Sequence, residues 1–288
     1  MGHVFGQEDA QRYADWFRSE PGRSALQVQK KLLCHLWRPT STQRVLDVGC
    51  GAGMFLEWLS GDGHQLTGID PSPPMLDLAR QRLPGRVALD KGYAEELPYE
   101  DNAFDTVVLM GTLEFVNDPT EALAEAFRVA RHQLLLGVYN KYALASWQSY
   151  LERLWKPSIY RYAKFFSVFG LRRMVEKVAA GPLPVTWRTG LLLPLPALKY
   201  SYPVEASRFI HWHPFGHFIA MRVDLRYPVH AVQNPLLCEV GSGIGPPGLH
   251  ASLWRLPQNR PERIRPTPVG TPVHGTRPQA IDGCSCLS

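Results

Sequence analysis

The 288-residue chain lacks several features that would fix its class at once. No apolar run approaches the roughly 18 residues that a membrane-spanning helix needs. The start of the chain carries no basic region followed by a long apolar core, so we expect no signal peptide. No internal repeat is visible. These absences favour an ordinary globular protein of one large domain, or of one domain and a tail.

Cysteine is scarce, and its five positions are scattered. Because the number is odd and the chain is not small, we do not expect a disulfide framework. Cys284 and Cys286 lack the C-x-x-C spacing of zinc and redox sites, and no set of four metal ligands is visible. We therefore predict no metal site, and we expect a reducing cytoplasm as the location.

Acidic side chains are few in the second half of the chain. Residues 140–288 hold 18 Lys/Arg and seven Asp/Glu, whereas residues 1–139 hold 13 and 19. The basic half could face an anionic substrate or a membrane surface, or it could be a solvated surface without a partner. No recognised nucleic-acid-binding module accompanies this charge, so nucleic acid is not an expected partner.

From residue 44 onward, strand patterns alternate with helix patterns, which is typical of a parallel sheet covered on both faces. Strands are expected at 44–48, 65–69, 87–89, 104–110, 133–139, 185–193 and 216–225, and helices at 8–19, 24–37, 54–60, 74–82 and 119–129. The last two strands could pair as an antiparallel ribbon at the sheet's edge. The pattern predicts an α/β, Rossmann-like, mostly parallel seven-stranded sheet with an antiparallel last strand. Its strand-to-helix loops would meet at one ligand-binding edge.

The chain divides into three predicted parts. Residues 1–40 carry two amphipathic helices, separated at Pro21-Gly22, and we expect them on the lid or acceptor side of the site. Residues 41–230 form the sheet domain, with an aromatic and basic helical insert at 140–182 that could be a lid, a substrate-pocket wall or a peripheral membrane contact. Residues 231–288 contain nine Pro and seven Gly, which is the composition of a poorly ordered tail.

The most informative stretch is Val45-Leu46-Asp47-Val48-Gly49-Cys50-Gly51-Ala52-Gly53, a buried strand that runs into a glycine-rich turn. Glycine lets the backbone approach a ligand, because no side chain stands in the way and positive φ is allowed. Asp70 ends the next strand, 17 residues after Gly53. An acid at this place can accept hydrogen bonds from ribose hydroxyls, so the sequence predicts a nucleoside-binding half-site.

Two details of the turn favour a nucleoside without phosphate. Asp47, two residues before Gly49, would repel a pyrophosphate but suits a ligand with hydroxyls and a cationic amino group. The dinucleotide pattern places its third glycine where Met54 stands, and it needs a helix N-terminus that is free to hold phosphate. An NAD(P)-dependent oxidoreductase is therefore disfavoured. A purely structural turn is the plainest alternative.

Two further motifs complete an ordered set: Gly92-Tyr93-Ala94-Glu95-Glu96-Leu97-Pro98 and Ala103-Phe104-Asp105-Thr106-Val107-Val108. The set resembles the class I S-adenosylmethionine-dependent methyltransferases. It is most similar to the broad type 11 subgroup that includes the ubiquinone and menaquinone biosynthesis methyltransferases. The resemblance covers about residues 40–139 and is architectural beyond them. It implies S-adenosylmethionine as cofactor and methyl transfer to a small-molecule acceptor, with aromatic, lipid-like and anionic acceptors all left open.

The resemblance also assigns roles by position. The glycine turn would cradle the amino-acid part of the cofactor, Asp70 would bind its ribose, and the loop that begins at Ala94 would flank the adenine ring. Met110-Gly111, at the end of a strand, would lie beside the methyl sulfonium. The predicted cofactor-binding residues are Asp47, Gly49, Cys50, Gly51, Gly53, Asp70, Pro71, Tyr93, Ala94, Glu95, Met110 and Gly111.

Two positions depart from the family's pattern. Many relatives carry Asp at the place of Tyr93, where the acid contacts the adenine amino group, whereas a tyrosine could stack on the ring. Many relatives carry His where Glu114 stands, so Glu114 is the candidate general base, with a surface acid as the alternative. These departures leave open a non-catalytic binding module that acts through the aromatic insert and the tail.

Overall fold

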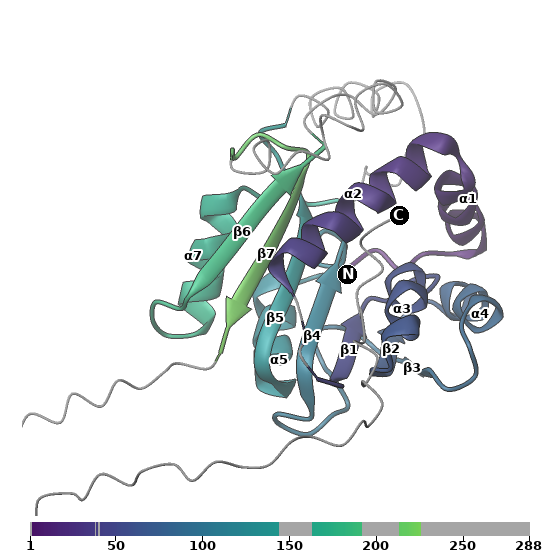
Figure 1. Cartoon of the computed structure of the whole chain (residues 1–288), viewed down its shortest axis with the longest axis horizontal. Coiled ribbons are helices and arrows are strands. Elements are labelled where there is room, and N and C mark those ends of the chain that lie inside the picture. The colour runs from purple at the N-terminus through teal and green to yellow at the C-terminus, as the bar shows by residue number, and fades with distance from the viewer. Residues whose placement is uncertain (1, 38, 40, 144–162, 192–212, 226–288) are drawn as a thin grey trace, which may run out of the picture. The chain divides into compact units, whose positions relative to one another are not determined.

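The computed structural model describes residues 2–37, 39, 41–143, 163–191 and 213–225. A seven-stranded sheet with the order β3-β2-β1-β4-β5-β7-β6 forms its centre (Figure 1). The strands are β1 (Arg44–Val48), β2 (Gln65–Asp70), β3 (Ala88–Lys91), β4 (Phe104–Met110), β5 (Ala130–Tyr139), β6 (Val185–Gly190) and β7 (Phe218–Asp224). The first five pair in parallel, and β7 runs antiparallel between β5 and β6. The predicted fold class is confirmed.

Helices cover both faces of this sheet (Figure 1). They are α1 (Gln7–Arg18), α2 (Glu20–Leu36), α3 (Met54–Leu59), α4 (Pro73–Arg82), α5 (Pro119–Val129) and α7 (Val168–Val178), with a 3-10 turn η1 (Ser60–Asp62) after α3. Neighbouring β4 residues Val107 and Val108 belong to two different core clusters. The cluster of Val107 includes buried residues of α5 and α7, and that of Val108 includes residues of α2, α3 and α4. Burial on both faces explains why β4 reads as a continuous apolar run.

Several of the observed helices begin where a side chain caps the first turn, and one predicted helix break differs from this. The predicted break at Pro21-Gly22 is wrong, because α2 begins at Glu20 with the Ser19 side chain accepting a hydrogen bond from the Gly22 amide at 3.3 Å. Proline is tolerated in a first helical turn, where its missing N–H has no partner to lose. The Ser72 side chain caps α4 by accepting a hydrogen bond from the Met75 amide at 3.2 Å.

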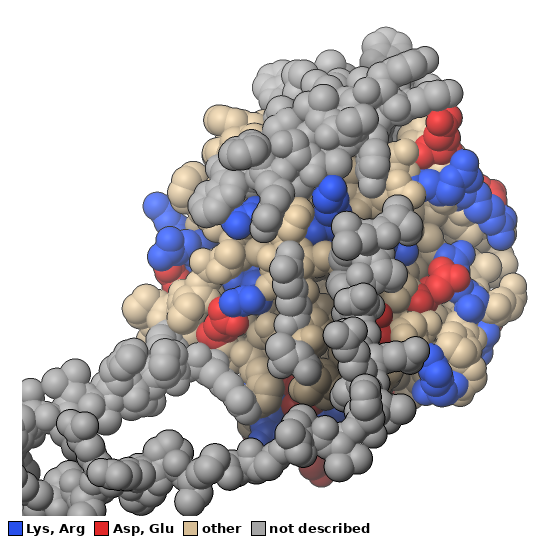
Figure 2. Space-filling model, in the orientation of Figure 1, with Lys and Arg blue, Asp and Glu red and all other residues tan. Residues whose placement is uncertain are grey.

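Several predicted parts lie wholly or partly outside the described residues. Of the predicted insert at 140–182, residues 144–162 lie outside them, and α7 is its one described helix. The predicted tail at 231–288 also lies outside them. Within the described ranges, no helix has the length and apolar character to cross a bilayer. Figure 2 shows basic and acidic side chains interspersed over the described part of one face.

Candidate functional site

The glycine turn follows β1 at the carboxyl edge of the parallel strands. Gly49, Gly51 and Gly53 have positive φ values of 70°, 52° and 74°, a backbone conformation that favours glycine. A Cβ at Gly49 would stand 2.6 Å from the Thr112 side chain, and one at Gly53 would stand 2.9 Å from Leu83. A Cβ at Gly51 would meet nothing nearer than the Met75 sulfur at 4.0 Å. Gly49 and Gly53 are therefore required by protein packing, whereas Gly51 leaves open space in front of the backbone.

Asp70 connects this turn to the start of α4. Its Oδ2 accepts a hydrogen bond from the Gly51 amide at 2.9 Å, and its Oδ1 accepts one from the Ser72 amide at 2.9 Å. Burial raises the pKa of Asp70, and the two amide hydrogen bonds oppose that shift. The carboxyl group is thus held in one orientation, and carboxylate oxygens retain further lone pairs for a ligand.

An outer cavity of about 660 Å³ opens in front of the turn. Its volume lies in the range of small-molecule and cofactor sites, roughly 300–1,000 Å³. Nine of the predicted cofactor-binding residues line it, namely Gly49, Gly51, Asp70, Pro71, Tyr93, Ala94, Glu95, Met110 and Gly111. Sequence reasoning therefore placed most of its candidates around one space.

Three predicted residues lie behind the wall of the outer cavity. Asp47 is 2% exposed, and its Oδ1 has no hydrogen-bond partner in the described structure. Burial, and then the charge of Asp70, raise the pKa of Asp47 to about 8. Cys50 packs in the core cluster of α2, α3 and α4, and burial raises the pKa of its thiol. Gly53 packs against Leu83 and Ala79, so it supports the turn without lining the cavity.

The N-terminal segment Gly2–Phe5 also lines the outer cavity. The sequence predicts helices of residues 1–40 on the lid or acceptor side, but it makes no prediction for this extended segment before them. The His3 amide donates to the Phe115 carbonyl at 2.9 Å, and the Ser72 hydroxyl donates to the Phe5 carbonyl at 2.7 Å. The rings of Phe5 and Phe115 meet edge to face at 5.2 Å. The segment therefore joins the loop after β4 to the start of α4. It has neither helical nor strand periodicity, so the sequence carried no signal for it.

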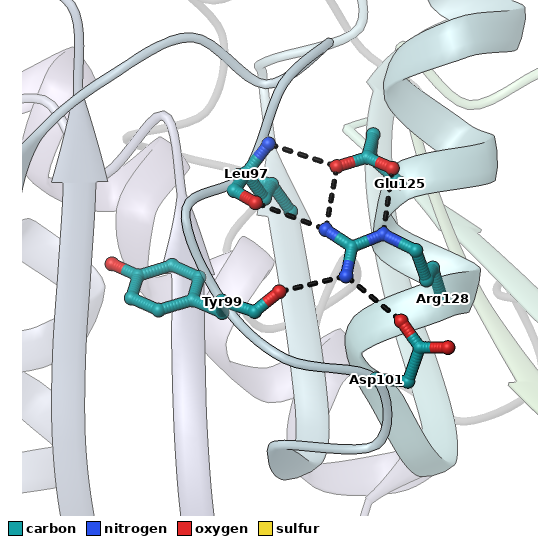
Figure 3. Close-up of polar contacts among 5 residues, drawn as sticks. All are labelled: Leu97, Tyr99, Asp101, Glu125 and Arg128. Atoms are coloured by element: carbon teal, nitrogen blue, oxygen red, sulfur yellow. Dashed lines mark hydrogen bonds and ion pairs between the residues drawn. The ribbon is translucent and has the colours of Figure 1, made fainter.

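Arg128 of α5 anchors the loop that carries Tyr93, Ala94 and Glu95. Its guanidinium donates to the backbone carbonyls of Leu97 at 2.9 Å and Tyr99 at 2.7 Å (Figure 3). It also pairs with Asp101 and Glu125, and Glu125 accepts from the Leu97 amide at 2.9 Å. The hydrogen bond from Arg128 lowers the pKa of Glu125. This network holds one wall of the outer cavity onto α5.

A smaller inner cavity of about 40 Å³ adjoins the outer one. The two share Phe5, Tyr13, Met110, Gly111 and Phe115 in their linings. The inner cavity is otherwise lined by Phe17, Gln29, Phe55, Tyr139 and Phe218. Met110 and Gly111, at the end of β4, therefore lie at the junction of the outer cavity and the aromatic inner cavity.

Glu114 is fully buried and lines neither cavity, so the alternative of a surface acid is wrong. Its Oε1 accepts a hydrogen bond from the Tyr139 amide at 2.6 Å, and its Oε2 has no partner in the part of the chain that the structure describes. Burial raises its pKa to about 8. The carboxyl group ties the loop after β4 to the end of β5, and its role as general base stays a prediction.

Comparisons with known proteins agree with this geometry. Residues 46–135 match a family model described as a methyltransferase domain. An uncharacterised methyltransferase of Mycobacterium tuberculosis is 41% identical over 100 residues, which are 35% of this chain and 40% of the relative. A ubiquinone biosynthesis O-methyltransferase of Thiobacillus denitrificans is 32% identical over 153 residues, which are 48% of this chain and 65% of the relative. The chain thus spans less than two thirds of the length of either relative.

A solved structure gives the same result for the fold. A protein of Thermotoga maritima, described as a SAM-dependent methyltransferase and possible histamine N-methyltransferase, superposes with a TM-score of 0.61 at 24% identity. The match covers 76% of this chain and 98% of that chain. Residues 46–135 are thus similar to a methyltransferase domain, and the structure has the fold of a SAM-dependent methyltransferase.

Proposed function

We propose that the chain binds S-adenosylmethionine in the outer cavity and transfers its methyl group to a small-molecule acceptor whose reacting group reaches the inner cavity. The observation that carries the proposal is the junction of the two spaces at Met110 and Gly111. A cofactor and an acceptor that meet there would be close enough to react, which is the main requirement for transfer between two bound molecules.

The residues of the outer cavity fit this cofactor. The open space at Gly51 admits a ligand against the backbone, and Asp70 presents a fixed carboxyl group to ribose hydroxyls. Among its described lining residues there is no lysine or arginine, whereas Asp70, Glu95, Glu96 and Glu121 are acidic. A pyrophosphate would find repulsion there in place of a cationic partner. This charge supports S-adenosylmethionine over NAD(P).

The chemistry divides between cofactor and chain. Bound S-adenosylmethionine would supply a methyl group on a sulfonium, whose sulfur keeps the electron pair of the broken bond. The chain's residues would bind and orient the two molecules and exclude water. The aromatic rings of the inner cavity suit that last task, because they offer few polar atoms to water. A base is needed only if the acceptor atom must lose a proton when it gains the methyl group, and Glu114 lines neither cavity.

Calorimetric titration tests the proposal at the level of the cofactor. We expect one molecule of S-adenosylmethionine, or of S-adenosylhomocysteine, to bind per chain, and we expect no heat from NAD or NADP. Radiolabelled methyl transfer to small molecules then tests turnover. Binding of NAD(P) without binding of S-adenosylhomocysteine would favour the oxidoreductase alternative. Cofactor binding without transfer to any acceptor would favour the non-catalytic module.

Replacing Arg128 with glutamine is expected to weaken cofactor binding from a distance. The variant loses the charged hydrogen bonds to the Leu97 and Tyr99 carbonyls, so the cavity wall that they hold is less ordered before binding. We expect roughly a tenfold loss of affinity for S-adenosylhomocysteine and a lower melting temperature. Arg172→Gln is the matched control, since Arg172 pairs with Glu176 on the surface of α7. Equal losses in both variants would contradict the anchoring role.

The acceptor class, peripheral membrane contact and a cytoplasmic location stay predictions from the sequence. The anionic acceptor left open by the basic second half receives no support from the described lining of the two cavities, which contains no lysine and no arginine. Acceptors without negative charge are therefore the ones to assay first.

A further inference from the structure

The strand order of the sheet arranges the lining of the outer cavity along one edge. Strands β4, β1, β2 and β3 are neighbours in that order, and the carboxyl ends of parallel strands meet at the same edge. Met110 ends β4, Asp70 ends β2, and a tight turn at 93–96 follows β3. A cofactor with its methyl group at Met110 and its ribose at Asp70 would therefore extend its base toward this turn.

Glu95 of the turn presents a fixed carboxyl group to the outer cavity. Its Oε1 accepts hydrogen bonds from the backbone amides of Asn117 at 2.7 Å and Asp118 at 3.4 Å. No described residue donates a hydrogen bond to its Oε2. Arg128 holds the backbone that follows the turn (Figure 3). The carboxyl group is thus held in place, with one oxygen left for a ligand.

The other acidic side chains of the outer cavity are less suited to contact a base. Asp70 faces the ribose in the proposed function and already accepts hydrogen bonds from two amides. Glu96 and Glu121 are exposed, and no hydrogen bond fixes their carboxyl groups to a described residue. A long exposed side chain loses rotamer freedom when it binds a ligand, which reduces its contribution. Glu95 is half-buried and already ordered, so it avoids most of this cost.

A fixed carboxylate distinguishes adenine from a base of the same shape. Adenine carries an exocyclic amino group, which donates hydrogen bonds, and a carboxylate accepts them. Hypoxanthine carries a carbonyl oxygen at the same place, and two acceptor oxygens repel each other. A site built to bond an N–H group rejects the analogue that lacks it, because its own polar group is then left without a partner.

Building on the proposed function, we propose that Glu95 is the residue that selects the adenine base of the cofactor. Its Oε1 stays bonded to the Asn117 amide, and its Oε2 accepts a hydrogen bond from the adenine amino group. Hydrogen bonds to an ionised acceptor are roughly twice as strong as those between neutral groups. One carboxyl group therefore joins the base both to the turn after β3 and to the loop before α5.

Calorimetric titration of the full chain with S-adenosylhomocysteine and S-inosylhomocysteine tests this role. The two ligands differ only in the base, which is adenine in the first and hypoxanthine in the second. We expect the wild-type chain to bind S-adenosylhomocysteine roughly a hundredfold more tightly. In Glu95→Gln the side-chain oxygen can stay on the Asn117 amide, which puts an NH₂ group in the place of Oε2. This group donates to the carbonyl oxygen of hypoxanthine, so the variant should bind S-inosylhomocysteine at least as tightly as S-adenosylhomocysteine.

Glu96→Gln is the matched control, because it makes the same change of charge in the same cavity, one residue away. It should keep the preference for adenine, even where it weakens both ligands alike. Glu95→Ala removes the acceptor, and the affinities of its two ligands should lie within about threefold of each other. Thermal unfolding establishes that each variant is folded.

The outcomes separate the two proposals. A preference for adenine that persists in both Glu95 variants would overturn the role of Glu95, as would its loss in Glu96→Gln alone. Equal binding of the two ligands to the wild-type chain would overturn the role of Glu95 and leave the proposed function standing. If the wild-type chain binds neither ligand, the proposed function and the role of Glu95 both fail.

Discussion

Replacement of Asp70 with alanine is expected to abolish cofactor binding in practice, with a loss of affinity of about a hundredfold or more. The carboxyl group has two functions, since it would accept hydrogen bonds from the ribose hydroxyls and it fixes the amides of Gly51 and Ser72. Hydrogen bonds to a charged partner contribute about 1.5–3 kcal/mol each. The loss of two such hydrogen bonds corresponds to a loss of affinity of about a hundredfold or more. Titration with S-adenosylhomocysteine measures this affinity.

The same substitution also lowers stability, so the binding measurement needs a folded variant. The buried Ser72 amide and the part-buried Gly51 amide lose their acceptor, which costs about 1–3 kcal/mol for a buried amide that stays without a partner. Circular dichroism at the titration temperature establishes that the variant is folded. Asp77→Ala is the matched control, because Asp77 lies on α4 near Asp70 in sequence but is exposed and pairs with Arg80. Wild-type affinity in Asp70→Ala would remove Asp70 from the cofactor site.

The fold was predictable because its signals are local and repeated. Parallel strands such as β4 hold a buried apolar run, and the strands β1, β2 and β4 are each followed by a helix, which makes the alternating pattern readable from the sequence. The bounds of β1 and β4 were predicted to the residue. The boundary at Pro21 was wrong because proline breaks a helix interior but fits a first turn.

The candidate site was predictable where it follows strand ends. Gly51 and Asp70 end up beside each other because parallel strands β1 and β2 are neighbours, and their carboxyl ends meet at one edge. The three glycines, however, look alike in the sequence and differ in the structure. Gly51 faces the cavity, whereas Gly53 packs against Leu83 of the segment that follows α4. Such a difference depends on long-range packing, which no local pattern encodes.

The acceptor side was predicted only as a region, the helices of residues 1–40, and its individual side chains were not. Phe17 and Gln29 come from the consecutive helices α1 and α2, Phe55 from α3 and Phe218 from β7, and α2 packs against β6 and β7. Each of them alone reads as an ordinary helix or strand residue. Glu114 was predicted to be near the methyl group, because it follows β4, but its side chain turns to the Tyr139 amide. Strand order places a residue's backbone, and packing decides where the side chain points.

Substitution of Glu114 with glutamine should flatten the dependence of stability on pH. The pKa of Glu114 rises from 4.5 to about 8 in the folded protein because its carboxyl group is buried. Between these values the folded state keeps a proton that the unfolded state has lost. The free energy of unfolding therefore falls as pH rises through this window, by about 1 kcal/mol per pH unit for this one group. Below pH 4.5 the cost is absent, and above pH 8 it is complete.

Glutamine does not titrate and can still accept a hydrogen bond from the Tyr139 amide. The variant should therefore lose the contribution of Glu114 to the pH dependence of the unfolding free energy. Urea unfolding at pH 5, 6, 7 and 8 measures this free energy. Some slope should persist, because burial also raises the pKa of Asp47 to about 8. Exposed Glu100→Gln is the control and should keep the wild-type slope. If Glu114→Gln retains methyl transfer while the dependence of its unfolding free energy on pH becomes flatter, Glu114 has a structural role and is not the general base. A wild-type slope with lost turnover would instead favour the general base that the sequence suggested.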